Sequence, residues 1–313
     1  MKRRTLATAF AMFLAYGTAG FAADGEACKT IRLSDPGWTD INSTNAIASV
    51  LLEALGYDPE IKTLSVPIGY QSMKNGDIDV FLGNWMPAQQ KFIEDLQAAD
   101  AVDILRKNLT GAKFTLAVPT YVADGGVKDF ADLNAHADKF DSKIYGIDPG
   151  AAGNANIQKM IDTNDFDLGD WEVVESGEQA MLAQVARSAP SKDWIVFLAW
   201  APHPMNSRFD LTYLSGGDEY FGPNYGGADV YTLARTGWAE DCPNAARLFR
   251  NLGFEIAMEN EMMGMILDDG EEPDDAARAW LKANPGSVGP WLEDVTTLAG
   301  DPGHAAVKAK LGL

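Results

Sequence analysis

The chain has few of the residues that mark an active site. Its 313 residues include two cysteines and three histidines, and His136, His203 and His304 show no spacing typical of a metal site. The glycine-containing stretch 150–153 has neither the dinucleotide-binding spacing nor the lysine of a P-loop, and no Gly-x-Ser-x-Gly elbow is present. We therefore expect no cofactor and no enzyme. An exported hydrolase is the less favoured alternative, because the sequence offers no coherent nucleophile–base pair.

Basic residues are also scarce. Lysine and arginine number 25 against 45 aspartate and glutamate residues, for a formal net charge of −20. Removal of Lys2, Arg3 and Arg4 with a leader segment would lower that charge by three, to −23. Such a field repels nucleic acid and anionic membranes, so we expect no nucleic-acid partner. It weakly favours a cationic or zwitterionic ligand, although an acidic surface also serves solubility alone.

Apolar runs long enough to cross a membrane are lacking after the start of the chain. The start itself is basic, Leu6 to Tyr16 is mostly apolar, and Gly20 to Ala22 supplies small residues before a cleavage point. This pattern predicts a secretory signal peptide over residues 1–22. The remaining chain is then exported.

The two cysteines, Cys28 and Cys242, both lie in the exported part. An oxidising compartment favours a disulfide between them, and two buried free thiols are the alternative. A disulfide would place the first mature residues and a late segment in one domain.

Strand and helix patterns alternate along the first hundred residues, which predicts a parallel sheet with right-handed crossovers. Asn42 and Ser43 are the expected caps of the first long helix, whose apolar face includes Ile47 and Leu51. A second α/β unit begins near residue 144, and three late helices follow it. We therefore expect one complete α/β unit to be inserted into another, which the late helices finish. The expected strands and helices of the first unit are 30–34, 41–55, 60–66, 69–75 and 80–82.

Three tryptophans have similar places in this pattern. Trp38, Trp85 and Trp200 each follow a predicted strand, and ligands of open α/β sheets bind beyond the carboxyl ends of strands. Indole faces attract cations, and a box of rings can hold a methylated ammonium, which has no N–H to donate. Asp40 could add a carboxylate, and Phe114, on a strand that crosses between units, could complete the box. Ordinary core packing of these rings is the alternative.

The segment Val80–Pro87 (VFLGNWMP) and the tail from Leu252–Phe254 through Ala279–Leu281 to Trp291–Leu292 carry a family resemblance. The chain resembles the periplasmic substrate-binding proteins of glycine betaine/choline ABC transporters, and within that group the choline-binding proteins. The resemblance covers essentially the whole mature chain.

The resemblance implies an α/β fold of two lobes, a type II periplasmic binding protein, with each lobe a mainly parallel sheet flanked by helices and two hinge crossovers. Lobe one would comprise residues 23–114 and 208–313, and lobe two residues 115–207. The cysteine pair also fits the group.

The resemblance also assigns the binding site. Trp38, Trp85 and Trp200 match three positions of its aromatic box, and Asp40 matches the acidic residue near the ligand. Phe114 stands where choline binders have tyrosine. Ala151 stands where an asparagine commonly bonds the choline hydroxyl. Asn154 lies close by and is a further candidate ligand contact.

We expect a periplasmic, monomeric protein that captures choline and passes it to an inner-membrane ABC permease. Because Ala151 cannot bond the choline hydroxyl, other methylated solutes are alternative ligands, namely glycine betaine, dimethylsulfoniopropionate and trimethylamine N-oxide. Asp40 would oppose a ligand with a carboxylate, which favours choline.

Overall fold

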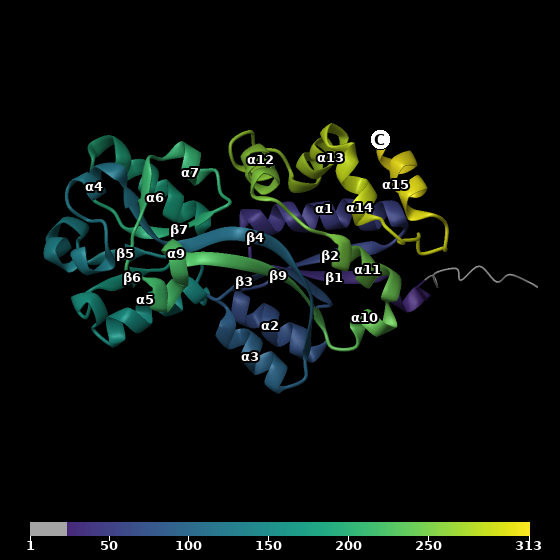
Figure 1. The fold of residues 1–313 in the computed structure, drawn as a ribbon, viewed down its shortest axis with the longest axis horizontal. Coiled ribbons are helices and arrows are strands. Elements are labelled where there is room, and N and C mark those ends of the chain that lie inside the picture. Colours follow the sequence, from purple (N-terminus) through teal and green to yellow (C-terminus); the bar gives the residue numbers. More distant parts are fainter. Residues whose placement is uncertain (1–23) are drawn as a thin grey trace, which may run out of the picture.

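The computed structural model describes residues 24–313, so the predicted signal peptide lies outside the described residues. The first half of the chain alternates strands and helices, as predicted (Figure 1). Its elements are β1 (Thr30–Asp35), α1 (Thr39–Leu55), β2 (Asp58–Thr63), α2 (Val66–Asn75), β3 (Val80–Met86), α3 (Gln90–Ala98) and β4 (Val102–Pro119).

The middle of the chain forms a second, smaller set of strands and helices. Its elements are α4 (Thr120–Asp124), β5 (Lys143–Tyr145), α5 (Ala152–Asp162), β6 (Glu172–Val174), α6 (Glu178–Ser191), β7 (Phe197–Ala201), α7 (Met205–Arg208), β8 (Leu211–Tyr213), α8 (Asp218–Phe221) and α9 (Pro223–Gly226).

The last third returns to the first set through one strand and is otherwise helical. Its elements are β9 (Gly227–Arg235), α10 (Trp238–Asp241), α11 (Pro243–Asn251), α12 (Ile256–Leu267), α13 (Pro273–Ala283), α14 (Val288–Trp291) and α15 (Gly303–Leu311). We call the group of β1–β3, α1–α3 and α10–α15 the first lobe, and the group of β5–β8 and α4–α9 the second lobe. Figure 1 shows the two groups side by side, with β4 and β9 running between them.

The strands join in the order β2-β1-β3-β9-β4-β7-β5-β6, and β8 pairs with β4. Within each lobe the pairing is parallel: β1 with β2 and β3, and β5 with β6 and β7. The two long crossing strands pair antiparallel, with each other and with their neighbours. The predicted parallel α/β units are therefore present, joined by an antiparallel pair.

β4 passes from one lobe to the other. Its first part pairs with β9 as far as Lys113, and from Lys113 to Ala117 it pairs with β7. β8 lies within the residues predicted for lobe one, and it pairs with Ala117–Pro119 of this strand. The residue boundaries of the two lobes stay a prediction.

Several element boundaries differ from the prediction, β2 and α2 included, and three of the differences concern segments that carry site residues. β3 does not end at Gly83–Asn84 but continues through Trp85, because antiparallel pairing with β9 extends it; Trp85 lies opposite Val230. Trp200 likewise lies inside β7, opposite Phe114. α1 begins at Thr39, ahead of the predicted caps Asn42 and Ser43.

The core of the first lobe forms around α1, whose predicted apolar face is confirmed. Ile47, Val50, Leu51 and Leu55 are all buried, and α1 packs against the helices α12, α13 and α15 as well as the sheet. The predicted disulfide joins Cys28 and Cys242, with 5.6 Å between their Cα atoms. It ties the segment before β1 to the start of α11. Between residues 24 and 313 no helix is both long and apolar enough to span a bilayer.

Candidate functional site

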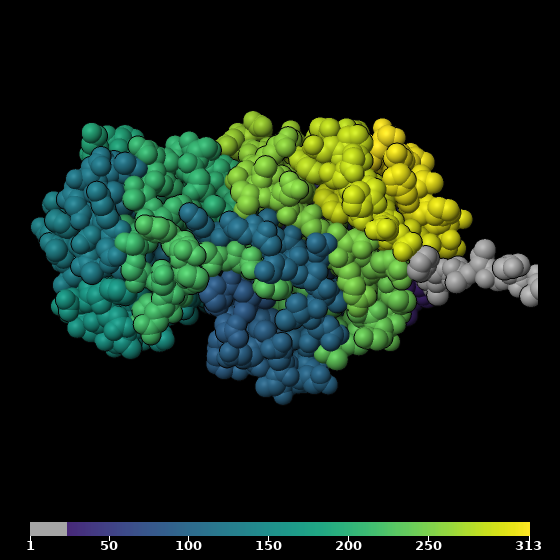
Figure 2. Space-filling view, in the orientation of Figure 1, coloured from purple at the N-terminus to yellow at the C-terminus, as the bar shows by residue number. Residues whose placement is uncertain are grey.

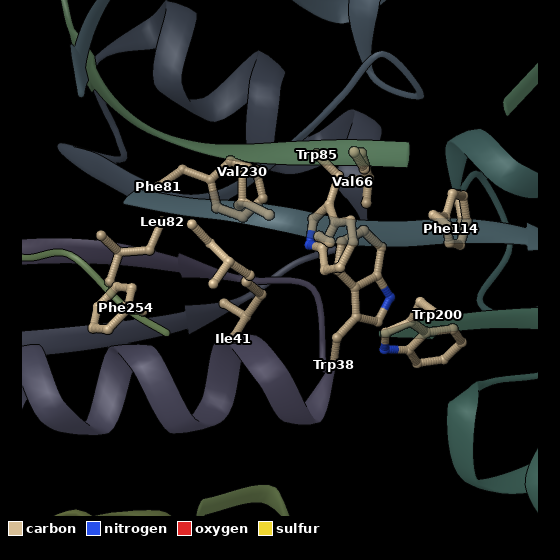
Figure 3. Close-up of a cluster of buried hydrophobic side chains, with 14 of the residues drawn as sticks. Trp38, Ile41, Val66, Phe81, Leu82, Trp85, Phe114, Trp200, Val230 and Phe254 are labelled. Atoms are coloured by element: carbon tan, nitrogen blue, oxygen red, sulfur yellow. The ribbon is translucent and has the colours of Figure 1, made fainter. Parts of the chain in front are cut away.

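A cavity lies between the lobes, where β4 crosses. Figure 3 shows Trp38, Trp85, Phe114 and Trp200 gathered at one end of α1, and in the space-filling view the surface is hollowed between the second lobe and the α2–α3 side of the first (Figure 2). The lining brings together six of the seven predicted ligand residues. It consists of Trp38, Asp40, Trp85, Ala88, Gln89, Phe114, Ile147, Ala151, Ala152, Gly153 and Trp200.

Trp38 and Asp40 come from the turn between β1 and α1. The Asp35 carboxylate braces this turn by accepting hydrogen bonds from Gly37 N (2.7 Å) and Asn42 Nδ2 (2.8 Å). Gly37 has φ +88°, a left-handed conformation that favours glycine. The turn therefore delivers the indole and the carboxylate to the cavity from the first turn of α1.

Trp85 is held by the loop that follows it. Its backbone N donates to Gln89 Oε1 and its carbonyl accepts from Gln89 N, both at 2.9 Å. Its indole Nε1 donates to Asp40 Oδ2 at 3.0 Å. One ring of the site therefore also fixes the orientation of the buried carboxylate.

Phe114 lies at the crossing of β4, between the other two rings. Its ring centroid is 6.2 Å from that of Trp85 and 6.4 Å from that of Trp200, with interplanar angles of 54° and 59°. The second lobe approaches through Gly153, where a Cβ would lie 2.5 Å from Phe114 Cζ. Only glycine lets the start of α5 come this close to the ring.

Ala151 and Asn154, the two predicted contacts of the second lobe, have different positions. Ala151 is the N-cap residue of α5, is buried, and lines the cavity. Asn154 does not line it: Oδ1 accepts from Ile147 N (2.9 Å), and Nδ2 donates to Ile147 O and to Glu175 Oε1. The amide of Asn154 is thus occupied in bracing the loop after β5, and the structure does not support a ligand contact there.

Asp40 is an unusual carboxyl group, since only 2 % of it is exposed. Burial, with a further contribution from the charge of Glu178, raises its pKa to about 7, although the hydrogen bond from Trp85 opposes the shift. Burial and the charge of Asp40 also raise the pKa of Glu259 on α12. The ionised form of Asp40 is therefore costly in the empty cavity, and a cation beside it would relieve that cost.

Three lining residues have a buried polar atom without a hydrogen-bond partner among the described residues, and two of these atoms are available to a ligand. Asp40 Oδ1 is an acceptor, and Gln89 Nε2 is a donor. The third such atom is Trp38 Nε1, and the Asp148 carboxylate is its nearby acceptor. Burial raises the pKa of Asp148, and hydrogen bonding by this indole opposes that rise. Buried polar atoms are rarely left unpaired. We therefore expect the ligand to supply one hydrogen-bond donor, for Asp40 Oδ1, and one acceptor, for Gln89 Nε2.

Sequence reasoning missed three of the polar residues around the cavity. Gln89 follows Trp85 by four residues, and nothing in its local pattern distinguishes it from a helix-capping side chain. Glu178 and His203 belong to the second lobe and meet the first lobe only in the fold. None of them forms part of a group suited to a metal ion, and residues 24–313 contain no such group.

The sequence profile of OpuAC, the substrate-binding domain of ABC-type glycine betaine transport systems, matches residues 29–283. The chain belongs to this family. As a member, it is the substrate-binding component of an ABC transporter, acts outside the cytoplasm and has a membrane permease as its partner. The predicted binding protein is confirmed, and the alternative of a hydrolase is set aside because the family is one of binding proteins.

Solved structures of high similarity agree. An ABC-transporter choline-binding protein in complex with choline is 57 % identical, with a TM-score of 0.91 over 92 % of this chain and 100 % of that chain. A choline-binding protein in an unliganded semi-closed conformation, also 57 % identical over the same shares, has a TM-score of 0.85. These neighbours confirm the type II binding-protein fold.

A curated relative from Listeria monocytogenes, glycine betaine/carnitine transport binding protein GbuC, is 29 % identical over 201 residues. The match covers 63 % of this chain and 65 % of the relative. This relative is thus named for two methylated ligands, glycine betaine and carnitine.

Proposed function

We propose that this protein captures choline in the aromatic cavity between its lobes and delivers it to its ABC permease. Trp38, Trp85, Phe114 and Trp200 would surround the trimethylammonium group, and Asp40 would balance its charge. Each cation–π contact contributes about 0.5–2 kcal/mol, at the upper end when the cation is desolvated. The N-terminal sequence supports a periplasmic location, with residues 1–22 as the signal peptide.

The observation that carries the proposal is the buried Asp40 carboxylate within an otherwise aromatic and apolar lining. No lysine, arginine or histidine belongs to the described lining, so no positive side chain there would pair with a ligand carboxylate. A glycine betaine carboxylate would instead meet Asp40, and like charges at short range are unfavourable.

The choline hydroxyl also fits the unpaired atoms. A hydroxyl both donates and accepts a hydrogen bond, so its chemistry matches the acceptor Asp40 Oδ1 and the donor Gln89 Nε2. Trimethylamine N-oxide offers only an acceptor. Gln89 could thus supply the donor that Ala151 cannot, which supports choline despite the missing asparagine. The choline-bound neighbour supports the same ligand.

A thermal-shift panel tests the proposal, with choline, glycine betaine, dimethylsulfoniopropionate, trimethylamine N-oxide and carnitine. A ligand that binds only the folded protein raises the melting temperature by mass action. We expect choline to give the largest shift at equal concentration. A larger shift with glycine betaine, or none with choline, would contradict the assignment.

A further inference from the structure

A buried carboxylate of the second lobe bonds to the ligand-binding turn of the first. Glu178, the first residue of α6, accepts hydrogen bonds from Thr39 N at 2.9 Å and from Thr39 Oγ1 at 2.6 Å. Thr39 lies between Trp38 and Asp40, both in the cavity lining. Thr39 and Glu178 are only 2 % and 3 % exposed, so the contact is enclosed between the lobes.

This contact completes a helix end that the first lobe leaves incomplete. The N-cap residue of α1 is Trp38, which provides no side-chain hydrogen bond to the first turn. The first N–H groups of a helix need partners and favour negative charge. Glu178 supplies both from the opposite lobe, so α1 gains its cap only when the lobes are together.

His203 holds Glu178 in place. Its Nδ1 accepts a hydrogen bond from Met205 N at 2.9 Å, so in the neutral ring the proton is on Nε2. Nε2 lies 3.1 Å from Glu178 Oε1 and donates to it. The second lobe thus presents an oriented carboxylate, and its own ligand residue Trp200 packs against the same imidazole, with 4.9 Å between ring centroids.

The same carboxylate also opposes closure of an empty cavity. The charge of Glu178 adds to the burial that raises the pKa of Asp40 and of Asp148, and Glu259 faces Asp40 from α12. Closing the lobes without a cation brings Glu178 and Asp148 of the second lobe toward Asp40 and Glu259 of the first, in a site shielded from water, where their repulsion is strong. A cation between the rings compensates it.

We infer that Glu178 and Thr39 form a cross-cleft latch, held by His203, which stabilises the closed form once a cationic ligand is bound. The latch rests on the proposed function, since it assigns closure to the positive charge of that ligand. Because the contact forms only on closure, it should slow release of the ligand and leave the association rate unchanged.

Thr39→Val is the sharpest variant, because it removes the hydroxyl donor and changes no charge. We expect it to speed choline dissociation by several-fold in stopped-flow tryptophan fluorescence, and Glu178→Gln by about tenfold or more. In the Thr39→Val/Glu178→Gln double variant the two effects should not multiply, since both remove one interaction. The exposed Glu172→Gln is the control, with 65 % of its side chain exposed, and should behave as wild type.

Melting of the ligand-free variants separates a latch from a structural contact. A latch leaves the ligand-free melting temperature nearly unchanged and reduces the choline-induced shift. A lower ligand-free melting temperature with an unchanged dissociation rate would overturn the inference. So would dissociation rates within twofold of wild type. Failure of wild type to bind choline would instead overturn the proposed ligand, and this inference with it.

Discussion

The two walls of the cavity are chemically different. The first-lobe wall, with Trp38, Asp40, Trp85 and Gln89, carries the buried carboxylate and both unpaired polar atoms available to a ligand. The second-lobe wall is apolar and mostly small, apart from its one indole. It consists of Ile147, Ala151, Ala152, Gly153 and Trp200. The first lobe thus presents charge and hydrogen-bonding groups to the cavity, whereas the second presents mainly apolar surface.

This division follows from local structure. Trp38 and Asp40 are fixed by a braced turn, and Trp85 by its paired backbone bonds to Gln89. The second wall depends on a residue without a side chain, because Gly153 leaves space for the ring of Phe114. If the division is real, substitutions in the first wall should affect affinity and selectivity most, and those in the second should act mainly on ligand release.

The largest effect is expected for Trp85→Ala. It removes a ring face and also the indole donor of Asp40, so choline should bind more weakly by about 2 kcal/mol, roughly thirtyfold in Kd. Trp85→Phe keeps a ring face without the donor and should lose less. Isothermal titration calorimetry measures both. Unchanged affinity in Trp85→Ala would remove this residue from the site.

Asp40→Asn should have the next largest effect, and a distinctive pH dependence. The pKa of Asp40 is raised to about 7 in the empty closed site, and a bound cation lowers it. Choline binding therefore releases a proton, and wild-type affinity should rise with pH up to about 7 and then level off. The slope can reach at most about tenfold per pH unit.

In Asp40→Asn the affinity for choline should be lower by about tenfold above pH 7, on the scale of a lost charge-assisted contact. The affinity of this variant should also depend less on pH. Glu178, Glu259 and Asp148 also surround the site, so the flattening in this variant identifies the titrating group. The variant should also melt higher than wild type without ligand at pH 8, because a buried ionised carboxylate is removed. An identical pH profile in both proteins would contradict this assignment.

Trp200→Ala tests the second wall. It should weaken choline binding by about 1 kcal/mol, a smaller loss than in Trp85→Ala, since one ring face is removed and no carboxylate loses a donor. The loss should appear in the dissociation rate measured by stopped-flow fluorescence. A larger loss than in Trp85→Ala, or one confined to association, would reverse the proposed roles of the walls.

The smallest effect is expected for Ala151→Asn, on the second wall. Asparagine at the N-cap of α5 should raise the ligand-free stability by about 1 kcal/mol, since alanine is a poor cap. If the new amide also reaches the hydroxyl, choline should gain affinity relative to tetramethylammonium, which has none. Chemical denaturation and competition titrations separate the two effects. If both the stability and the selectivity stayed unchanged, the placement of Ala151 at the N-cap of α5 and beside the ligand would be contradicted.

Sequence patterns were sufficient for much of the fold. The apolar face of α1 and the disulfide between Cys28 and Cys242 follow from periodicity and compartment, and the structure confirms both. The strand ends at Trp85 and Trp200 were predicted wrongly, because antiparallel pairing with β9 and β4 extends both strands. That pairing is tertiary, and local sequence does not encode it.

The site was predictable to the extent that it is aromatic. Trp38, Trp85, Phe114 and Trp200 stand out by residue type, and the fold gathers them in one cavity. The polar residues were harder to predict. Glu178 bonds to Thr39 only across the lobes, whereas Asn154 bonds to Ile147, seven residues away, in the loop after β5.

The most direct test of the account compares choline with its neutral carbon isostere, 3,3-dimethyl-1-butanol. The two share shape and hydroxyl, so only the positive charge differs. If the rings and Asp40 recognise a cation, calorimetry should show saturable 1:1 binding of choline and at least about a hundredfold weaker binding of the isostere, which corresponds to roughly 2.7 kcal/mol. Equal affinity for both would contradict the account.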